Sequence, residues 1–78
     1  MRTRENKAVV TFFTTAEAMA TERLCREQSI PGRLIPAPRK LSADCGLAWA
    51  SAAEERERLE SALRSAAVEY DRICELLL

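Results

Sequence analysis

The sequence contains no histidine, and this absence excludes imidazole-based catalysis and most zinc chemistry. Its cysteines number three, with no CxxC spacing, so neither a disulfide framework nor a zinc site is expected. Aromatic residues make up 5% of the chain, too few for a platform on which nucleic-acid bases stack. No apolar run approaches the roughly 20 residues that span a bilayer. We therefore expect no metal, no nucleic-acid partner and no membrane insertion.

The chain has no excess of charge of one sign, because 12 basic residues balance 12 acidic ones. This balance argues against a general nucleic-acid or membrane-surface binder. The distribution is nevertheless uneven, since residues 28–43 carry three cations and no acid: Arg33, Arg39 and Lys40. The short apolar stretch after the charged "MRTRENK" lacks the length and cleavage site of a signal peptide, so we expect a cytoplasmic protein.

The hydrophobic pattern indicates one small α+β domain over residues 8–78, preceded by a flexible arm over residues 1–7. A chain of 78 residues, 47% of them hydrophobic, can form a single thin core. Period-two and apolar segments predict strands, and amphipathic segments predict helices. The order is β-α-β-β-α-β, a ferredoxin-like antiparallel four-stranded sheet with two helices on one face. The expected strands span 8–13, 33–36, 46–50 and 70–77, and the expected helices span 15–28 and 52–67.

Two capping-box signatures mark the expected starts of the helices, namely Thr14 with Glu17 and Ser51 with Glu54. For the first helix, periodicity leaves two buried stripes open, one through Ala18, Thr21, Cys25 and Gln28, the other through Ala16, Ala20 and Leu24. The second helix is expected to bury Ala52, Leu59, Leu63 and Ala66 and to pair Glu54 with Arg58 on its outer face.

Cys45 is the cysteine whose predicted position favours chemistry. It precedes the third strand, which neighbours the first strand in this fold, so it is expected near the end of that strand. There the first helix begins, and we expect Thr14 and Thr15 to contribute a helix N-terminus that stabilises a thiolate.

The segment before Cys45 is basic and rigid. Pro36 and Pro38 stiffen it, and Gly46 leaves space for a partner's backbone to approach. We assign thiolate or anion stabilisation to the three local cations, Arg33, Arg39 and Lys40. The adjacent carboxylate of Asp44 acts in the opposite sense.

The stretch "GRLIPAPRKLSADCGLAW" resembles the small selenium/sulfur carrier family, in which an I-P-x-P-R-like turn leads to a Cys-Gly strand start. "TTAEAMATERLC" is similar to the family's first helix, and "YDRICEL" to its last strand. The specific part of the likeness comprises Arg33, Pro36, Pro38, Arg39, Ser42, Cys45 and Gly46. The resemblance implies that Cys45 carries sulfur or selenium as a persulfide or perselenide, and that Cys25 lies in the core.

Plainer interpretations accompany each assignment. Cys45 could be a packing residue, as is expected of Cys25 and Cys74. The cations could instead protect an edge strand. We therefore hold two hypotheses: a carrier without cofactor that exchanges its cargo with donor and acceptor proteins, or a ligand-sensing or protein-interaction module. A carrier is favoured over a stand-alone enzyme, and an uncovered sheet face with the leucines of "ELLL" could form a homodimer.

Overall fold

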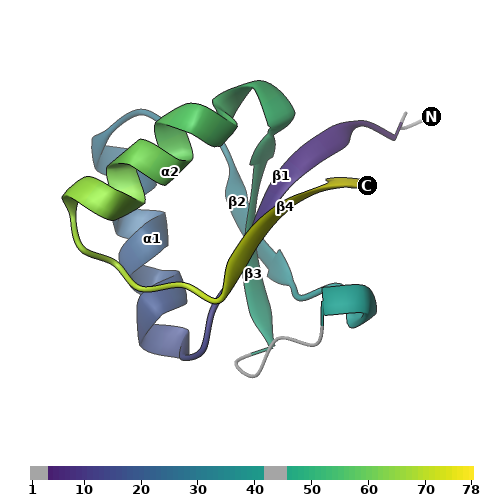
Figure 1. The fold of residues 1–78 in the computed structure, drawn as a ribbon, viewed down its shortest axis with the longest axis horizontal. Helices are drawn as coiled ribbons and strands as arrows, with labels where there is room; N and C mark the ends of the chain where they lie inside the picture. The colour runs from purple at the N-terminus through teal and green to yellow at the C-terminus, as the bar shows by residue number, and fades with distance from the viewer. Residues whose placement is uncertain (1–3, 42–45) are drawn as a thin grey trace.

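A computed structural model describes residues 4–41 and 46–78 of the chain. Within these residues, four antiparallel strands form one sheet in the order β2-β3-β1-β4, and two helices lie on one side of it (Figure 1). This arrangement confirms the predicted ferredoxin-like α+β fold. The elements are β1 (Asn6–Thr11), α1 (Thr15–Glu27), β2 (Arg33–Pro36), the 3-10 turn η1 (Arg39–Leu41), β3 (Leu47–Ala52), the 3-10 turn η2 (Ala53–Glu55), α2 (Arg56–Ser65) and β4 (Arg72–Leu77).

The first strand begins earlier than its apolar pattern indicates. Asn6 and Lys7, expected in an N-terminal arm, pair with Leu77 and Leu76 of β4. Since β1 lies between β3 and β4, Lys7 is paired on both sides, with Ala52 and with Leu76, and this pairing holds polar residues in the strand that propensity alone would leave out.

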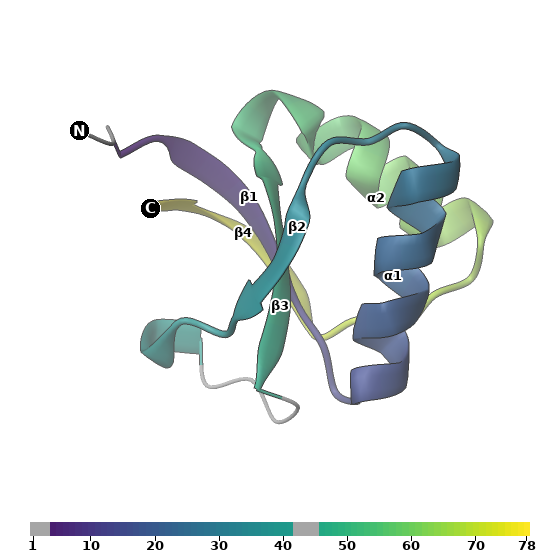
Figure 2. The same cartoon turned by 180° about the vertical axis from the view of Figure 1, so that it is seen from behind.

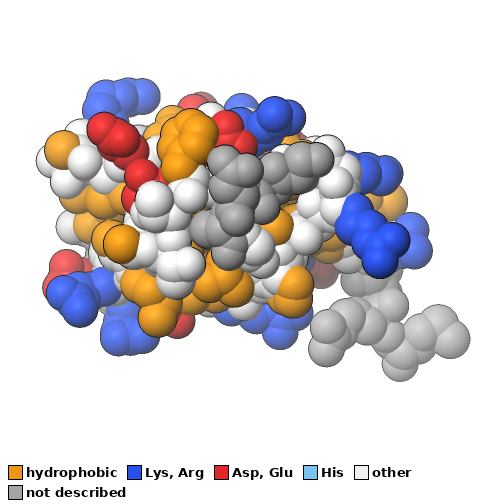
Figure 3. All heavy atoms as spheres, turned by 90° about the horizontal axis from the view of Figure 1, so that it is seen from below, with side chains coloured by type: hydrophobic (Ala, Val, Ile, Leu, Met, Phe, Trp, Pro, Cys, Tyr) orange, Lys and Arg blue, Asp and Glu red, His pale blue; other side chains and the backbone are white. Residues whose placement is uncertain are grey.

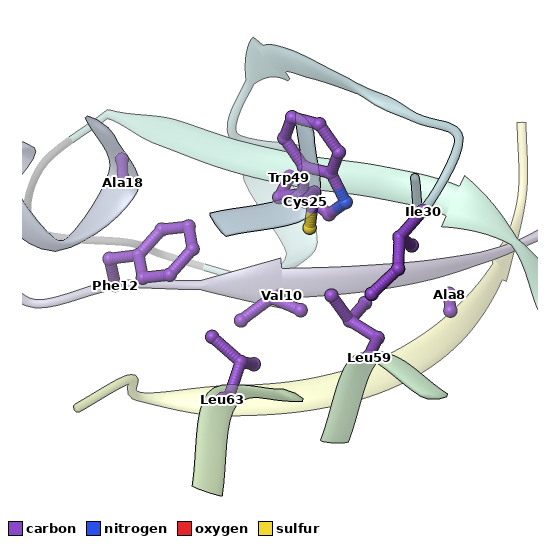
Figure 4. Packing of buried hydrophobic residues seen from close by; sticks show 9 residues of the cluster. All are labelled: Ala8, Val10, Phe12, Ala18, Cys25, Ile30, Trp49, Leu59 and Leu63. Carbon is purple, nitrogen blue, oxygen red and sulfur yellow. The ribbon is translucent and has the colours of Figure 1, made fainter. Parts of the chain in front are cut away.

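The main core lies between the sheet and the two helices (Figure 4). Alternate residues of β1 point into it, as the period of two requires. From α1 the buried residues are Ala18, Thr21 and Cys25, so the first of the two predicted stripes is the correct one, although Gln28 at its end is exposed. The core comprises Ala8, Val10, Phe12, Ala18, Cys25, Ile30, Trp49, Leu59 and Leu63.

The predicted start of the second helix is wrong. Ser51 lies within β3, where its hydroxyl accepts a buried hydrogen bond of 2.8 Å from the indole Nε1 of Trp49. Because β3 continues to Ala52, Ser51 is not the cap of a helix, and α2 begins only at Arg56, after η2. Its packing follows the prediction at Leu59 and Leu63, which are fully buried.

The ends of α2 differ from the prediction in the same region. Ala52 is only half-buried in β3, and Ala66 is exposed just beyond the last turn. Ala67 adopts a left-handed φ of 55°, which ends the helix. On the outer face, Arg58 forms an ion pair with Glu55 at 2.7 Å, where the sequence predicted a pair with Glu54.

The sheet face that no helix covers is partly closed by η1 (Figure 2). Leu41 is 6% exposed and packs there in a second core with Val9, Ala48 and Ala50. The face that was expected to be open is therefore partly covered at this end of the sheet. No helix within the described ranges has the length and apolar character needed to cross a bilayer.

Candidate functional site: the β2–β3 connection

The connection between β2 and β3 is closed at its base. The Ala37 amide donates to the Gly46 carbonyl oxygen at 2.9 Å, and Pro36 is paired with Leu47 in the register of the two strands. Gly46 is exposed with a φ of +77°, a conformation that glycine adopts without the steric cost other residues meet. Ser42, Asp44 and Cys45, which complete the predicted motif, lie outside the described residues.

Leu41 anchors the first part of this connection to the sheet. Its amide donates to the Pro38 carbonyl oxygen at 3.0 Å, which forms the 3-10 turn, and its side chain is buried in the second core. Sequence reasoning did not single out this residue. A lone leucine after two cations has no periodicity to mark it as buried, and only the packing reveals its role.

Arg39 and Lys40 extend from the same turn into solvent. Figure 3 views the molecule from this end; Lys and Arg side chains lie at its right, the side where Figure 1 shows η1, and also at the left, the top and the bottom. Among residues 4–41 and 46–78, neither cation has an ion-pair partner. No acidic side chain of the described residues neutralises their charges.

Arg33 lies elsewhere. It is the first residue of β2 and pairs with Ala50, whereas the connection leaves from the other end of the strand at Pro36. Arg33 lines a groove of about 720 Å³ at the starts of β1 and β2, together with Glu5, Lys7, Pro31, Gly32, Ile35, Ala50, Ser51, Ala52 and Leu78. The structure thus separates Arg33 from the two cations on η1.

The N-terminus of α1 is confirmed as a capping box, and its groups are engaged within the box. The Thr14 hydroxyl accepts from the Glu17 amide at 3.2 Å. The Glu17 carboxylate accepts in return from the amides of Phe13 at 2.9 Å and Thr14 at 3.3 Å. The carboxylate of Glu17 therefore already occupies the positive end of this helix.

This helix end and the basic turn lie on different sides of the sheet. In Figures 1 and 2 the start of α1 is on the helical side, and η1 is on the other. Thr14 and Thr15, at the start of α1, therefore lie on the other side of the sheet from Arg39 and Lys40 on η1. The predicted stabilising groups are thus divided among three places rather than gathered around one.

The two described cysteines differ in their surroundings. Cys25 of α1 is fully buried in the main core, and burial raises the pKa of its thiol to about 11 because the charged form would lose its hydration. Cys74 is half-buried on β4, opposite Val9. Cys25 is therefore a packing residue that stays protonated at neutral pH. In the described part of the chain, no group of three His, Cys, Asp or Glu could hold a metal ion.

The fold and this connection together define a small α+β protein. The connection between β2 and β3 carries two exposed cations, and a backbone hydrogen bond joins its two ends. Residues 7–75 match the family described as "Putative Se/S carrier protein-like". This match covers nearly the whole chain, and the protein belongs to that family. No curated protein and no solved structure gives a significant match.

Proposed function

We propose that this protein is a carrier of sulfur or selenium, and that the carrier group is the thiol of Cys45. The observation that supports this most directly is membership of the family over residues 7–75, combined with the Cys-Gly pair that precedes β3 in the sequence. The proposal gives the chain no cofactor and no turnover of a small molecule on its own. Donor and acceptor proteins perform the chemistry before and after it.

The construction of the connection supports this role. The bond from the Ala37 amide to Gly46 closes its base, and burial of Leu41 holds its first half against the sheet. A thiol presented from such a segment loses less conformational entropy when a partner docks than one on an unanchored loop. Arg39 and Lys40, exposed on the same segment, favour the thiolate form and attract anionic partners.

The proposed transfer is a thiol exchange that needs no external oxidant or reductant. The Cys45 thiolate attacks the terminal sulfur of a donor persulfide, R–S–SH. The donor S–S bond breaks, the donor sulfur leaves as a thiolate, and Cys45 becomes the persulfide. An acceptor thiolate then attacks the terminal sulfur of Cys45–S–SH in the same way. With a donor perselenide, selenium replaces the transferred sulfur and the electron count is unchanged.

The cytoplasm suits this mechanism, because its reducing poise keeps thiols free for exchange. The remaining cysteines are poorer candidates for the carrier group. Burial of Cys25 excludes a docking partner and disfavours its thiolate. Cys74 belongs to the second core, at the edge of the sheet, and has no basic turn of the kind that carries Arg39 and Lys40 next to it in the sequence.

The decisive experiment is intact-protein mass spectrometry after incubation with a persulfide donor. We expect a gain of one sulfur atom in the wild type and in Cys74→Ser, reversed by a thiol reductant, and no gain in Cys45→Ser. Peptide mapping locates the added atom. An equal gain in Cys45→Ser would exclude Cys45 as the carrier.

The groove beside Arg33 favours one alternative, a ligand-sensing or interaction module in which Cys45 is incidental. Its volume of about 720 Å³ and the Arg33 guanidinium, which has no ion-pair partner among residues 4–41 and 46–78, suit a small anion. The rate of Cys45 alkylation by iodoacetamide at neutral pH separates the two functions. A rate above that of free cysteine supports the carrier, and a rate no higher supports the module.

A further inference from the structure

The two edges of the sheet are built differently. The β2 edge has four residues, ends at Pro36 and begins two residues after Pro31. Proline cannot donate a ladder hydrogen bond, so this edge resists pairing with another strand. The β4 edge, Arg72–Leu77, has six residues and no proline. Within the described residues, β4 pairs only with β1, and its other edge has no strand beside it.

The apolar residues of β4 that pack against the two cores are only partly buried. On the helical side, Ile73 is half-buried against the main core. On the other side, Cys74 and Leu76 are half-buried against the second core. Leu77 is 57% exposed, although it continues the strand. The partly buried apolar residues on both faces give this edge an apolar surface that a further strand would cover.

The backbone of β4 fixes which groups are free to pair. Glu5 and Leu78 exchange both of their backbone hydrogen bonds, at 2.9 and 3.0 Å. In an antiparallel ladder such pairs recur at every second residue, so Leu76 and Cys74 also direct their amides and carbonyls toward β1. The groups of Ile73, Glu75 and Leu77 therefore point away from the sheet.

We propose that a second copy of this chain pairs with β4 antiparallel, about a two-fold axis at Glu75. This register places Ile73 opposite Leu77 of the other copy on the helical face, and Cys74 opposite Leu76 on the other face. Apolar residues then meet apolar residues at the two positions nearest the axis on each side. A two-fold axis at Cys74 would instead oppose Ile73 to Glu75, which matches an apolar residue with a carboxylate.

Charge at the axis is also compatible with this arrangement. Two Glu75 side chains face each other, and like charges directly opposite would be destabilising. Each Glu75, however, is held by the Arg56 guanidinium of its own chain at 3.1 Å. Arg56 also contacts Glu60 at 3.4 Å and the Ile73 carbonyl at 3.5 Å. The two copies thus bring together alternating positive and negative groups. The second lone pair of the Ile73 carbonyl remains for the partner's amide.

Sedimentation equilibrium over a concentration series tests the assembly. We expect a dimer for the wild type and a monomer for Leu77→Lys, which introduces two charges into the paired edge without disturbing a buried site. Met19→Lys is the matched control, because Met19 is 52% exposed on α1, and it should remain dimeric. A monomeric wild type, a dimeric Leu77→Lys or a monomeric Met19→Lys would each overturn the proposal.

Disulfide crosslinking tests the register, in a Cys45→Ser background that makes the result independent of the proposed carrier function. One chain retains Cys74, and a second chain of different mass carries Cys74→Ser and Leu76→Cys. The two chains are mixed and oxidised with diamide, which accepts the two electrons and two protons released by the thiols. Residues 74 and 76 form a non-hydrogen-bonded pair, where the Cα separation suits a disulfide.

The register predicts covalent dimers that contain one chain of each kind. Covalent dimers made only of chains with Cys74 would place the axis at Cys74 and overturn the register. Absence of any covalent dimer would contradict pairing through β4.

Discussion

The side chains of Leu41 and Val9 are buried in one core on the face of the sheet that the helices leave uncovered. This shared core joins the turn that carries Arg39 and Lys40 to the central strand β1. It also sets the position from which the chain enters the segment containing Cys45. A single aliphatic side chain thus couples the stability of the sheet to the presentation of the proposed carrier segment.

Leu41→Ala is expected to lower the free energy of unfolding by about 2–4 kcal/mol, since it removes a buried leucine and leaves a cavity beside Val9. Denaturant titration measures this change. Met19→Ala is the control, because that side chain is exposed on α1, and its effect should stay within about 0.5 kcal/mol. We also expect faster hydrogen exchange of the Ala37 amide in Leu41→Ala, measured by NMR. Unchanged exchange would mean that Leu41 does not hold the base of the connection.

The buried hydrogen bond from Trp49 to Ser51 gives a second prediction. Ser51→Ala should cost about 1–3 kcal/mol, because the indole N–H is left buried without its acceptor. Trp49→Phe removes the donor, so Ser51→Ala should cost less in that background than in the wild type. A double-mutant cycle of unfolding free energies measures the difference. Equal costs in the two backgrounds would show that the hydroxyl acts only through packing.

Ser51 also illustrates where sequence reasoning reached its limit. Periodicity predicted the number, type and order of the main elements correctly, because each half of the chain has a strand pattern followed by a helical one. The pair Ser51 and Glu54 has the spacing of a capping box, but the same serine continues the period of two from Trp49. Only the pairing of β3 with β1 decides between these interpretations.

The candidate site shows a similar limit. The cations at positions 33, 39 and 40 are close in sequence, which suggested one positive field. In the structure, β2 carries Arg33 away from the connection, and η1 turns Arg39 and Lys40 to the side opposite α1. Sequence proximity and the predicted topology placed the three cations and the start of the first helix at the end of the sheet that carries Cys45. Neither of them specifies which side of the sheet a turn occupies.

The capping box permits a test of whether Thr14 acts on the thiol. Thr14→Ala should cost about 1 kcal/mol in unfolding free energy, since the Glu17 amide loses its acceptor. Because the Glu17 carboxylate already occupies this helix end, we expect the pH profile of Cys45 alkylation to be unchanged. A rise in the pKa of the Cys45 thiol in this variant would instead assign the helix N-terminus to the thiolate.

Removal of the exposed cations on η1 should change the alkylation rate of Cys45 but not the stability of the fold. Arg39→Ala and Lys40→Ala should slow alkylation of Cys45 at neutral pH by lowering its thiolate fraction, with little effect on stability. The effect should shrink as salt is added, because exposed charges are screened. Arg64→Ala, at the exposed end of α2, is the control and should leave the rate unchanged. Equal rates in all three variants would remove these cations from the site.

The buried thiol of Cys25 predicts a dependence of stability on alkaline pH. Its pKa is raised by burial from 9.0 to about 11, so the folded state holds the proton more tightly than the unfolded state. The resulting stabilisation is complete below pH 9 and declines as the pH rises through about 11, with a total of about 3 kcal/mol at most. Cys25→Ala should be less stable at neutral pH because of lost packing, but its unfolding free energy should fall less steeply across this interval. Denaturant titrations of both proteins at several alkaline pH values compare the slopes. Parallel slopes would mean that Cys25 ionises as readily in the folded chain as in the unfolded one.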